Sequence, residues 1–251
     1  MRQAVKSYTM IEQALNNKTV LITGAARRIG RLFALACGRA GADVIIHHGH
    51  SDDEAESVRA EIQELGRKAW IFKADLSDPS QAQNLIPLIN ESTPLQGLVN
   101  SAAIFEPLSL EQTSPEAWGR HMTLNLTAPF LLSQAFAKQA EADARIVNIL
   151  DWRALRPGAD HFPYTISKAA LAAMTKSLAV ALAPRVLVNA LALGAILPPS
   201  DGTTNPDIVK NIPLKRWANE NEIERALLFL LTCPAYITGE IIHVDGGRHL
   251  V

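Results

Sequence analysis

The sequence predicts a single α/β domain built on a doubly wound parallel sheet in three layers. Short runs rich in Val, Ile and Leu alternate along the chain with amphipathic segments of helical length. Several of the runs are almost continuously apolar, which is typical of parallel strands covered by helices on both faces. Strands that alternate with helices form such a sheet through right-handed crossovers.

The individual elements follow from this alternation and from local start signals. Pro115 after Ser114 fits the first turn of a helix, and the acidic residues from Asp52 to Glu54 suit the positive end of a helix dipole. The expected strands cover residues 19–23, 43–47, 69–73, 96–100, 144–150, 186–191 and 241–244. The expected helices cover residues 28–40, 52–65, 79–90, 115–139, 163–184 and 220–231.

Composition excludes several classes of protein. Apolar residues make up 48% of the 251 residues and the net charge is −1, which argues against disorder and against a general nucleic-acid binder. Cys37 and Cys233 alone cannot build a disulfide framework or a thiolate zinc site. Without an apolar leader or an uninterrupted apolar span, a cytoplasmic protein with no membrane contact is expected. Residues 1–17 lack periodicity and are interpreted as an amino-terminal arm before a domain at 18–251.

The turn after the first strand is the first candidate for ligand binding, because doubly wound folds bind ligands outside the carboxyl ends of their strands. Gly24 permits a tight turn, and Gly30 lets the next helix approach closely. The free N–H groups at that helix start favour a pyrophosphate. A small glycine turn could also be merely structural.

The charges around this turn indicate which dinucleotide would bind. Arg27 and Arg28 stand where the helix dipole disfavours cations, which suggests an additional phosphate. No carboxylate follows the second strand before Asp52, although NAD-binding folds usually place an acid there for the ribose 2′-hydroxyl. The predicted cofactor is therefore NADPH rather than NADH.

Polar residues at the end of the second strand would help to hold the 2′-phosphate. Ser51, together with His48 or His50, is expected to assist Arg28. These histidines could instead be ordinary surface residues. A metal site is disfavoured because no thiolate or paired acid lies close by, so no metal is expected.

The sharpest motif is Tyr164 with Lys168, at the start of a long apolar helix. Residues four apart share one helical face, so the phenol and the ammonium can point into a common space. We expect the cation to lower the pKa of the phenol and make it a proton donor or acceptor. The pair lies close in sequence to Asp151, which closes an apolar strand. Taken alone, such a pair is more often found on the surface.

From Thr19 to Val251 the chain resembles the short-chain dehydrogenase/reductase family, whose fold is Rossmann-like. The resemblance is carried by many motifs in the family's order. They are Thr23, Gly24 and Gly30, Asp75, Leu98-Val99-Asn100-Ser101-Ala102-Ala103, Asn125, Tyr164 with Lys168, Val188-Asn189-Ala190 and Val244-Asp245-Gly246-Gly247.

Two departures from the family pattern resemble its pteridine reductase branch, which includes the dihydromonapterin reductases. Asp151 stands where most members have a catalytic serine, and Arg28 stands in place of the middle glycine. Other features similar to that branch are His47, Ser51, Phe105 and the terminal segment from Asp245 to Leu250. Ser101, Ala103 and Leu193 differ from the usual residues, and the divergent segment 197–213 leaves the substrate open.

The resemblance implies specific roles for the site residues. Asp151, Tyr164, Lys168 and Asn125 would be catalytic, with Lys168 on the nicotinamide ribose and Asn125 ordering a water. Phe105 would stack a pterin ring against the nicotinamide and bind substrate together with Asp151 and Tyr164, although it could be an ordinary apolar loop residue. The cofactor-binding residues would be Gly24, Arg27, Arg28, Ile29, Gly30, His48, His50, Ser51, Asp75, Leu76, Asn100, Ala102, Ala103, Tyr164, Lys168, Gly194 and Ile196.

These roles predict an NADPH-dependent reductase that acts on the C=N bond of a pteridine or dihydropteridine. Asp151 and Tyr164 would share the proton that the ring nitrogen gains, which favours activity at mildly acidic pH. One alternative is an NADPH-dependent carbonyl reductase acting on a 3-oxoacyl group or a small ketone. Another is a non-catalytic NADP(H)-sensing protein. A homotetramer assembled on the helices at 115–139 and 163–184 is expected from the family.

Overall fold

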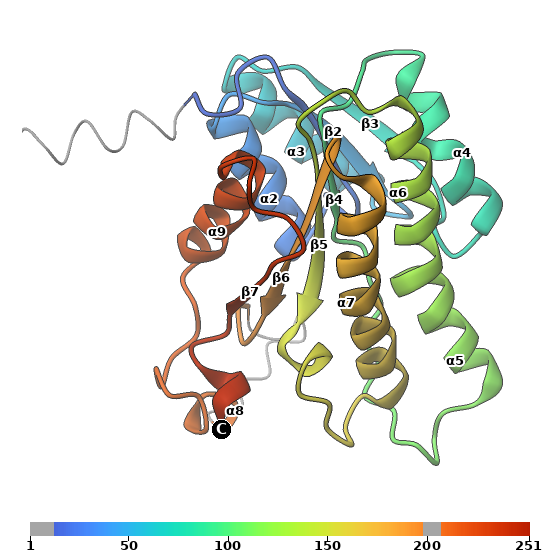
Figure 1. Cartoon of the computed structure of the whole chain (residues 1–251), viewed down its shortest axis with the longest axis vertical. Helices are drawn as coiled ribbons and strands as arrows, with labels where there is room; N and C mark the ends of the chain where they lie inside the picture. The colour runs from blue at the N-terminus through green and yellow to red at the C-terminus, as the bar shows by residue number, and fades with distance from the viewer. Residues whose placement is uncertain (1–12, 198–206) are drawn as a thin grey trace, which may run out of the picture.

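The computed structural model describes residues 13–197 and 207–251, which form one domain around a parallel sheet (Figure 1). The strand order is β3-β2-β1-β4-β5-β6-β7, so the Rossmann-like fold class expected from the sequence is confirmed. The strands are β1 Thr19–Ile22, β2 Asp43–His48, β3 Ala69–Lys73, β4 Gly97–Asn100, β5 Ala144–Asp151, β6 Val186–Leu193 and β7 Ile241–Val244.

Helices cover both faces of this sheet (Figure 1). One layer holds α2 Arg28–Arg39, α3 Asp52–Glu64 and α9 Glu220–Thr232. The other holds α4 Pro79–Asn90, α5 Pro115–Met122, α6 Ala128–Gln139 and α7 Phe162–Leu182. Alternate residues of one strand therefore enter different cores: Val20 and Ile22 pack with the first layer, and Leu21 packs with the second. This double covering is the physical reason for the continuous apolar runs.

The strand order creates the crevice in which such folds bind ligands. From β1 the chain runs outward through β2 to β3, and it then crosses back to place β4 on the other side of β1. The connections after β1 and after β4 consequently leave the sheet in opposite directions, at neighbouring strand ends. A ligand crevice is expected at that topological switch point.

The long helix expected at 115–139 is interrupted. A π-helical segment, Thr123–Thr127, separates α5 from α6. Pro129 has no N–H to give the carbonyl of Asn125 in an α-helical pattern, and we attribute the wider turn to this missing donor. The turn lies over the strand ends, next to the site described below.

Further differences from expectation concern short elements and the amino terminus. The brief helices Trp152–Ala154, α8 Asp207–Lys210 and Arg248–Leu250 were not anticipated. Of the expected arm, residues 1–12 lie outside the described part, as do residues 198–206 of the divergent segment. Leu15 is buried and its N–H donates to the carbonyl of Ala40, so the end of the expected arm packs on the domain.

Helix α7 is apolar and 21 residues long, enough by length and composition to cross a membrane. It packs along β5 and β6, where Leu171 and Ala172 meet Leu150 and Ala190. The same helix carries Tyr164 and Lys168 on its buried side. One face of this helix therefore packs against the sheet.

Candidate active site

The turn after β1 is built so closely that two glycines are required. Gly24 has φ +66°, and a Cβ there would lie 3.1 Å from the Cα of Ala102. A Cβ on Gly30 would lie 2.1 Å from the carbonyl oxygen of Gly24. Helix α2 can therefore approach the turn only because residue 30 lacks a side chain.

Side chains from the neighbouring strands hold this turn in place. The hydroxyl of Thr23 accepts the N–H groups of Ser101 and Ala102 at 2.9 and 3.0 Å, which joins the ends of β1 and β4. His47 Nδ1 lies 3.2 Å from the N–H of Gly24, and its Nε2 lies 3.0 Å from the carbonyl oxygen of Ala74. Burial lowers the pKa of His47 to about 4, so the ring is neutral, with its proton on Nε2.

A cavity of 630 Å³, the cofactor cavity, opens beside this turn. It brings together ten of the residues expected to bind the cofactor: Gly24, Arg27, Arg28, Ile29, Gly30, His50, Asp75, Leu76, Ala102 and Ala103. Its other lining residues include His47, Gly49 and Ala74 from the strands nearby. Glycine-rich backbone and a helix start thus share one wall, as phosphate binding requires.

Three expected cofactor residues, His48, Ser51 and Asn100, line neither this cavity nor the neighbouring cavity described below. His48 turns its Nδ1 to the N–H of Ser51 at 3.2 Å, so these two residues bond to each other. Asn100 is buried and donates from its amide to Asn148 Oδ1 at 2.8 Å. Position along the strand thus identified Asn100 correctly as a strand-end residue, but its side chain joins β4 to β5 instead of entering the cavity.

Arg28 begins α2 with φ +50°, a conformation that glycine adopts far more easily. Its side chain lines the cofactor cavity and also a neighbouring cavity of 730 Å³, the substrate cavity. Ile29, Ser101 and Ala103 line both spaces as well, so the two cavities adjoin. The unusual backbone places a cation at the boundary between them.

The substrate cavity gathers the expected chemistry from distant parts of the chain. Asp151 at the end of β5 and Tyr164 with Lys168 on α7 all line it. Phe105, Gly194 and Ile196 complete the expected set around it. The hydroxyl of Tyr164 donates to Asp151 Oδ2 at 3.5 Å.

The protonation of this group differs from expectation in one respect. Burial and the neighbouring Asp151 raise the pKa of Tyr164 well above its usual value, whereas the sequence predicted a lowering by Lys168. Lys168 Nζ donates to the carbonyl of Ile149 at 2.7 Å and lies 5.8 Å from the tyrosine ring centroid. Burial also lowers the pKa of this lysine to about 8, and Lys168 is not among the groups that shift the pKa of the phenol. The expected lowering was therefore wrong.

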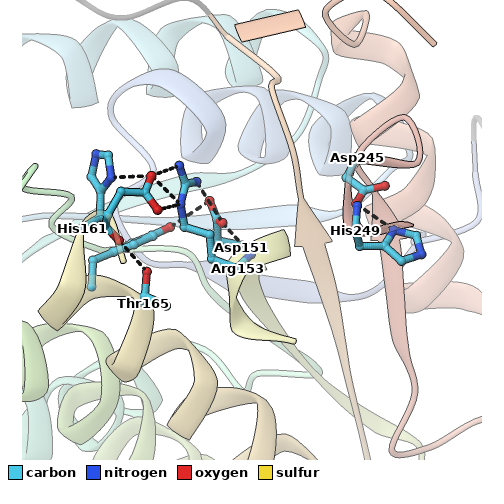
Figure 2. Close-up of polar contacts among 8 residues, drawn as sticks. Asp151, Arg153, His161, Thr165, Asp245 and His249 are labelled. Atoms are coloured by element: carbon cyan, nitrogen blue, oxygen red, sulfur yellow. Dashed lines mark hydrogen bonds and ion pairs between the residues drawn. The ribbon is translucent and has the colours of Figure 1, made fainter. Parts of the chain in front are cut away.

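Asp151 is buried as well, and burial raises the pKa of its carboxyl group although Arg153 opposes the shift. The N–H of Arg153 donates to Asp151 Oδ1 at 2.8 Å, and its guanidinium lies 3.3 Å from the same oxygen. Arg153, which Figure 2 shows beside Asp151, also pairs with Asp160 at 2.6 Å, and this contributes to an Asp160 pKa of about 2. The sequence analysis missed Arg153, whose only signal is its place two residues after Asp151.

Phe105 and His161 form an aromatic wall of the substrate cavity beside Tyr164. Phe105 is 54% exposed, stacks on His161 with ring centroids 4.1 Å apart, and meets Tyr164 edge-on at 4.7 Å. His161 was also missed by the sequence analysis, because it enters the site through a left-handed backbone at the start of α7. The wall offers flat apolar surface beside the phenol hydroxyl, which suits a planar ring.

Asn125 lies behind the cavity rather than on it. Its Oδ1 accepts the N–H of Ile104 at 2.9 Å, and its amide donates to the Ile104 carbonyl and to Ser167 Oγ, both at 3.1 Å. Through these bonds the π-helical segment fixes the loop that carries Phe105 against α7. In this geometry Asn125 positions the site.

No group of three or more His, Cys, Asp or Glu side chains able to hold a metal ion occurs within residues 13–197 and 207–251. The arrangement is a nucleotide-sized crevice that leads to a buried acid pair. Such an arrangement can move a proton next to a bound ring.

Comparison with known proteins identifies the family. The model of the family described as enoyl-(acyl carrier protein) reductase matches residues 24–249. The chain belongs to the short-chain dehydrogenase/reductase family. The resemblance noted in the sequence is thereby confirmed at family level.

Relatives within the short-chain dehydrogenase/reductase family carry different names. A 3-oxoacyl-[acyl-carrier-protein] reductase of Synechocystis sp. is 34% identical over 93% of this chain and 98% of its own. The structure of FolM alternative dihydrofolate reductase 1 from Brucella canis, complexed with NADP, is 33% identical with a TM-score of 0.88, covering 95% of this chain and 96% of that one. A blue fluorescent protein from a metagenomic library, in complex with NADPH, is 31% identical with a TM-score of 0.89, covering 94% and 99%.

Proposed function

We propose that this protein is an NADPH-dependent reductase of a pterin-type C=N bond, in a pteridine or dihydropteridine. The observation that carries the proposal is the buried carboxyl group of Asp151 facing the hydroxyl of Tyr164. Most members of the family have a serine at this position. The planar wall of Phe105 and the adjoining cofactor cavity support the same reading.

The cofactor part of the proposal rests on shape and charge. Gly24 and Gly30 let the start of α2 pack closely against the turn, and both line the cavity in which a pyrophosphate would lie. Arg27, Arg28 and His50 line the cavity beside the end of β2 and favour a 2′-phosphate. Similar structures bound to NADP or NADPH support the same choice. When bound, NADPH supplies a hydride from its nicotinamide ring.

The residues of this chain would supply the proton. A C=N bond gains a hydride on carbon and a proton on nitrogen, and the nitrogen would face the pair formed by Asp151 and Tyr164. Burial raises the pKa of each group, so each holds its proton more tightly than a free side chain would. Lys168 lies next to the pair and would hold the nicotinamide ribose.

Reduction of a carbonyl group is the second candidate function. Among the named relatives, 3-oxoacyl-[acyl-carrier-protein] reductases match over nearly the whole chain, and these matches favour the alternative over the pterin reading. Tyr164 alone could protonate a carbonyl oxygen, and the aromatic wall does not exclude an acyl chain. The expected homotetramer and the cytoplasmic location stay predictions.

Steady-state NADPH oxidation separates the two candidates. We expect turnover of 7,8-dihydrobiopterin and dihydrofolate with kcat/KM about 100-fold above that of acetoacetyl-CoA and small ketones, because a site built for one hydrogen-bonding pattern rejects the other. The Tyr164→Phe variant is the control for turnover in this site and should be inactive. Efficient ketone reduction without pterin reduction would contradict the proposal.

A further inference from the structure

The substrate cavity carries more positive than negative charge along its described lining. Arg28, Arg153, Lys168 and Arg248 line it, and Asp151 is the one carboxylate among the described lining residues. Arg153 is engaged by Asp151 and Asp160, and Lys168 donates to a backbone carbonyl. These two cations serve the internal structure of the site. Arg28 stands at the boundary with the cofactor cavity.

Arg248 reaches this cavity from the opposite side, on the short terminal helix. Asp245 holds that segment, because its carboxylate accepts the N–H groups of Gly247 and His249 at 2.9 and 2.8 Å. The same carboxylate contacts the Nδ1 of His249 at 2.8 Å (Figure 2). The ring of His249 stacks on His243 with centroids 3.8 Å apart. The backbone that carries Arg248 is thus fixed on both sides.

The guanidinium of Arg248 lies over an aromatic ring. Its central carbon is 4.6 Å from the ring centroid of Trp152, and that of Arg153 is 4.7 Å from the same centroid. Stacking uses the face of a guanidinium and leaves its N–H edge available for a planar acceptor. Within the described residues, no carboxylate lies at ion-pair distance from Arg248, and no hydrogen bond from its guanidinium is formed.

The electrostatic environment of Arg248 favours the binding of an anion. Burial, together with the charge of Arg153, lowers the pKa of Arg248 below its usual value. A bound carboxylate between the guanidinium and solvent would offset the free-energy cost of burying this charge. Charge-assisted, bidentate hydrogen bonds to carboxylates are the strongest that arginine makes.

We propose that Arg248 binds an anionic group of the substrate, a carboxylate on a side chain attached to the reduced ring. This inference rests on the proposed function for the identity of the ring, and it adds that the ring carries an anionic group. With the ring against Phe105 and Tyr164, a side chain that leaves the ring would run across Trp152 to Arg248. The preferred substrate is then a dihydropterin with an acidic tail, not one with a neutral tail.

The test compares two substrates in one variant. Dihydrofolate carries carboxylates, whereas the side chain of 7,8-dihydrobiopterin is uncharged. We expect Arg248→Gln to raise KM for dihydrofolate about tenfold, the size of one lost charge-assisted bond, and to leave its kcat and both constants for dihydrobiopterin nearly unchanged. Arg248→Lys keeps the positive charge but loses the paired N–H donors of the guanidinium. Its KM for dihydrofolate should therefore lie between those of the wild type and Arg248→Gln. Arg185→Gln, which removes an exposed charge outside the cavity lining, is the matched control.

The two proposals fail in distinguishable ways. Absence of pterin turnover in the wild-type protein would overturn the proposed function. The charge comparison then moves to acetoacetyl-CoA, which carries phosphates, against neutral ethyl acetoacetate, and to calorimetric binding of folate against biopterin in the presence of NADP⁺. Equal effects of Arg248→Gln on charged and neutral partners, or none on either, would overturn the role of Arg248.

Discussion

Asp151 and Tyr164 derive their chemistry from burial more than from a nearby cation. Desolvation is the largest cause of the raised pKa of each group, and the negative charge of Asp151 further raises the pKa of Tyr164. Arg153 moderates the effect on Asp151 without reversing it. The pair therefore keeps a shared proton to a higher pH than a free aspartate side chain would.

A pH profile of Asp151→Asn tests this shared proton. In the wild type, reduction should be constant at low pH and fall as pH rises through the apparent pKa of the pair, since the proton donor is lost above it. Asparagine cannot hold the proton, so kcat should drop roughly 100-fold, within the range of general acid catalysis, and the Asp151-dependent limb should disappear. Single-turnover rates across pH measure both effects. An unchanged rate in the variant, or a wild-type enzyme that needs alkaline pH for reduction, would refute the shared proton.

Individual side chains were predictable where the chain itself fixed their place. Asp151 ends a strand and Tyr164 begins a helix, so position alone brought them toward one edge of the sheet. Arg153 and His161 could not be found this way, since their roles depend on a tight turn and a left-handed residue. The pKa of Tyr164 could not be predicted either, because burial has no local sequence signal.

At the scale of elements, the junction of β1 and α2 shows how a turn constrains a helix. Gly24 and Gly30 come within contact distance although they are six positions apart in the sequence. Sequence reasoning predicted this close approach, because glycines at a strand-to-helix turn have few other uses. It did not predict the π-helical segment around Asn125, because helical periodicity continues through it and only the local hydrogen bonding changes.

Gly30→Ala should damage this junction. The new methyl group would lie 2.1 Å from a backbone oxygen that cannot rotate away, so α2 must shift. We expect a loss of about 1–3 kcal/mol in the free energy of unfolding, typical of overpacking, and NADPH binding weakened at least about tenfold. Denaturant unfolding and fluorescence titration measure the two quantities.

Gly119→Ala is the matched control on another helix. Nothing lies within 4 Å of a Cβ built on Gly119 in α5, so alanine should stabilise the protein by about 0.5–1 kcal/mol through helix propensity. NADPH affinity should stay at the wild-type level. Equal behaviour of the two variants would mean that the close approach at Gly30 has no energetic importance.

On the scale of the whole molecule, the order of elements was readable because each strand is buried on both faces and each helix on one. The two cores on either side of the sheet turn that pattern into three layers. What the pattern could not supply is the far side of the substrate cavity. Arg248 and Trp217 arrive there from the carboxyl-terminal part of the chain, beside a segment too divergent to interpret.

The cofactor cavity is formed by residues from several strand ends of this single domain, so a ligand that fills it should stabilise the folded state. Ligand at a hundred times its Kd adds about 2.7 kcal/mol to the folded state, which raises Tm by about 5–10 °C for a chain of this size. NADPH should reach this shift at lower concentration than NADH, since Arg27, Arg28 and His50 line the cofactor cavity near the end of β2 and the nearest following acid, Asp52, pairs with Lys73. Thermal unfolding with each dinucleotide at matched concentrations gives the comparison. Equal shifts for the two dinucleotides would show that this end of β2 does not select the phosphate, and the preference for NADPH would then have to be abandoned.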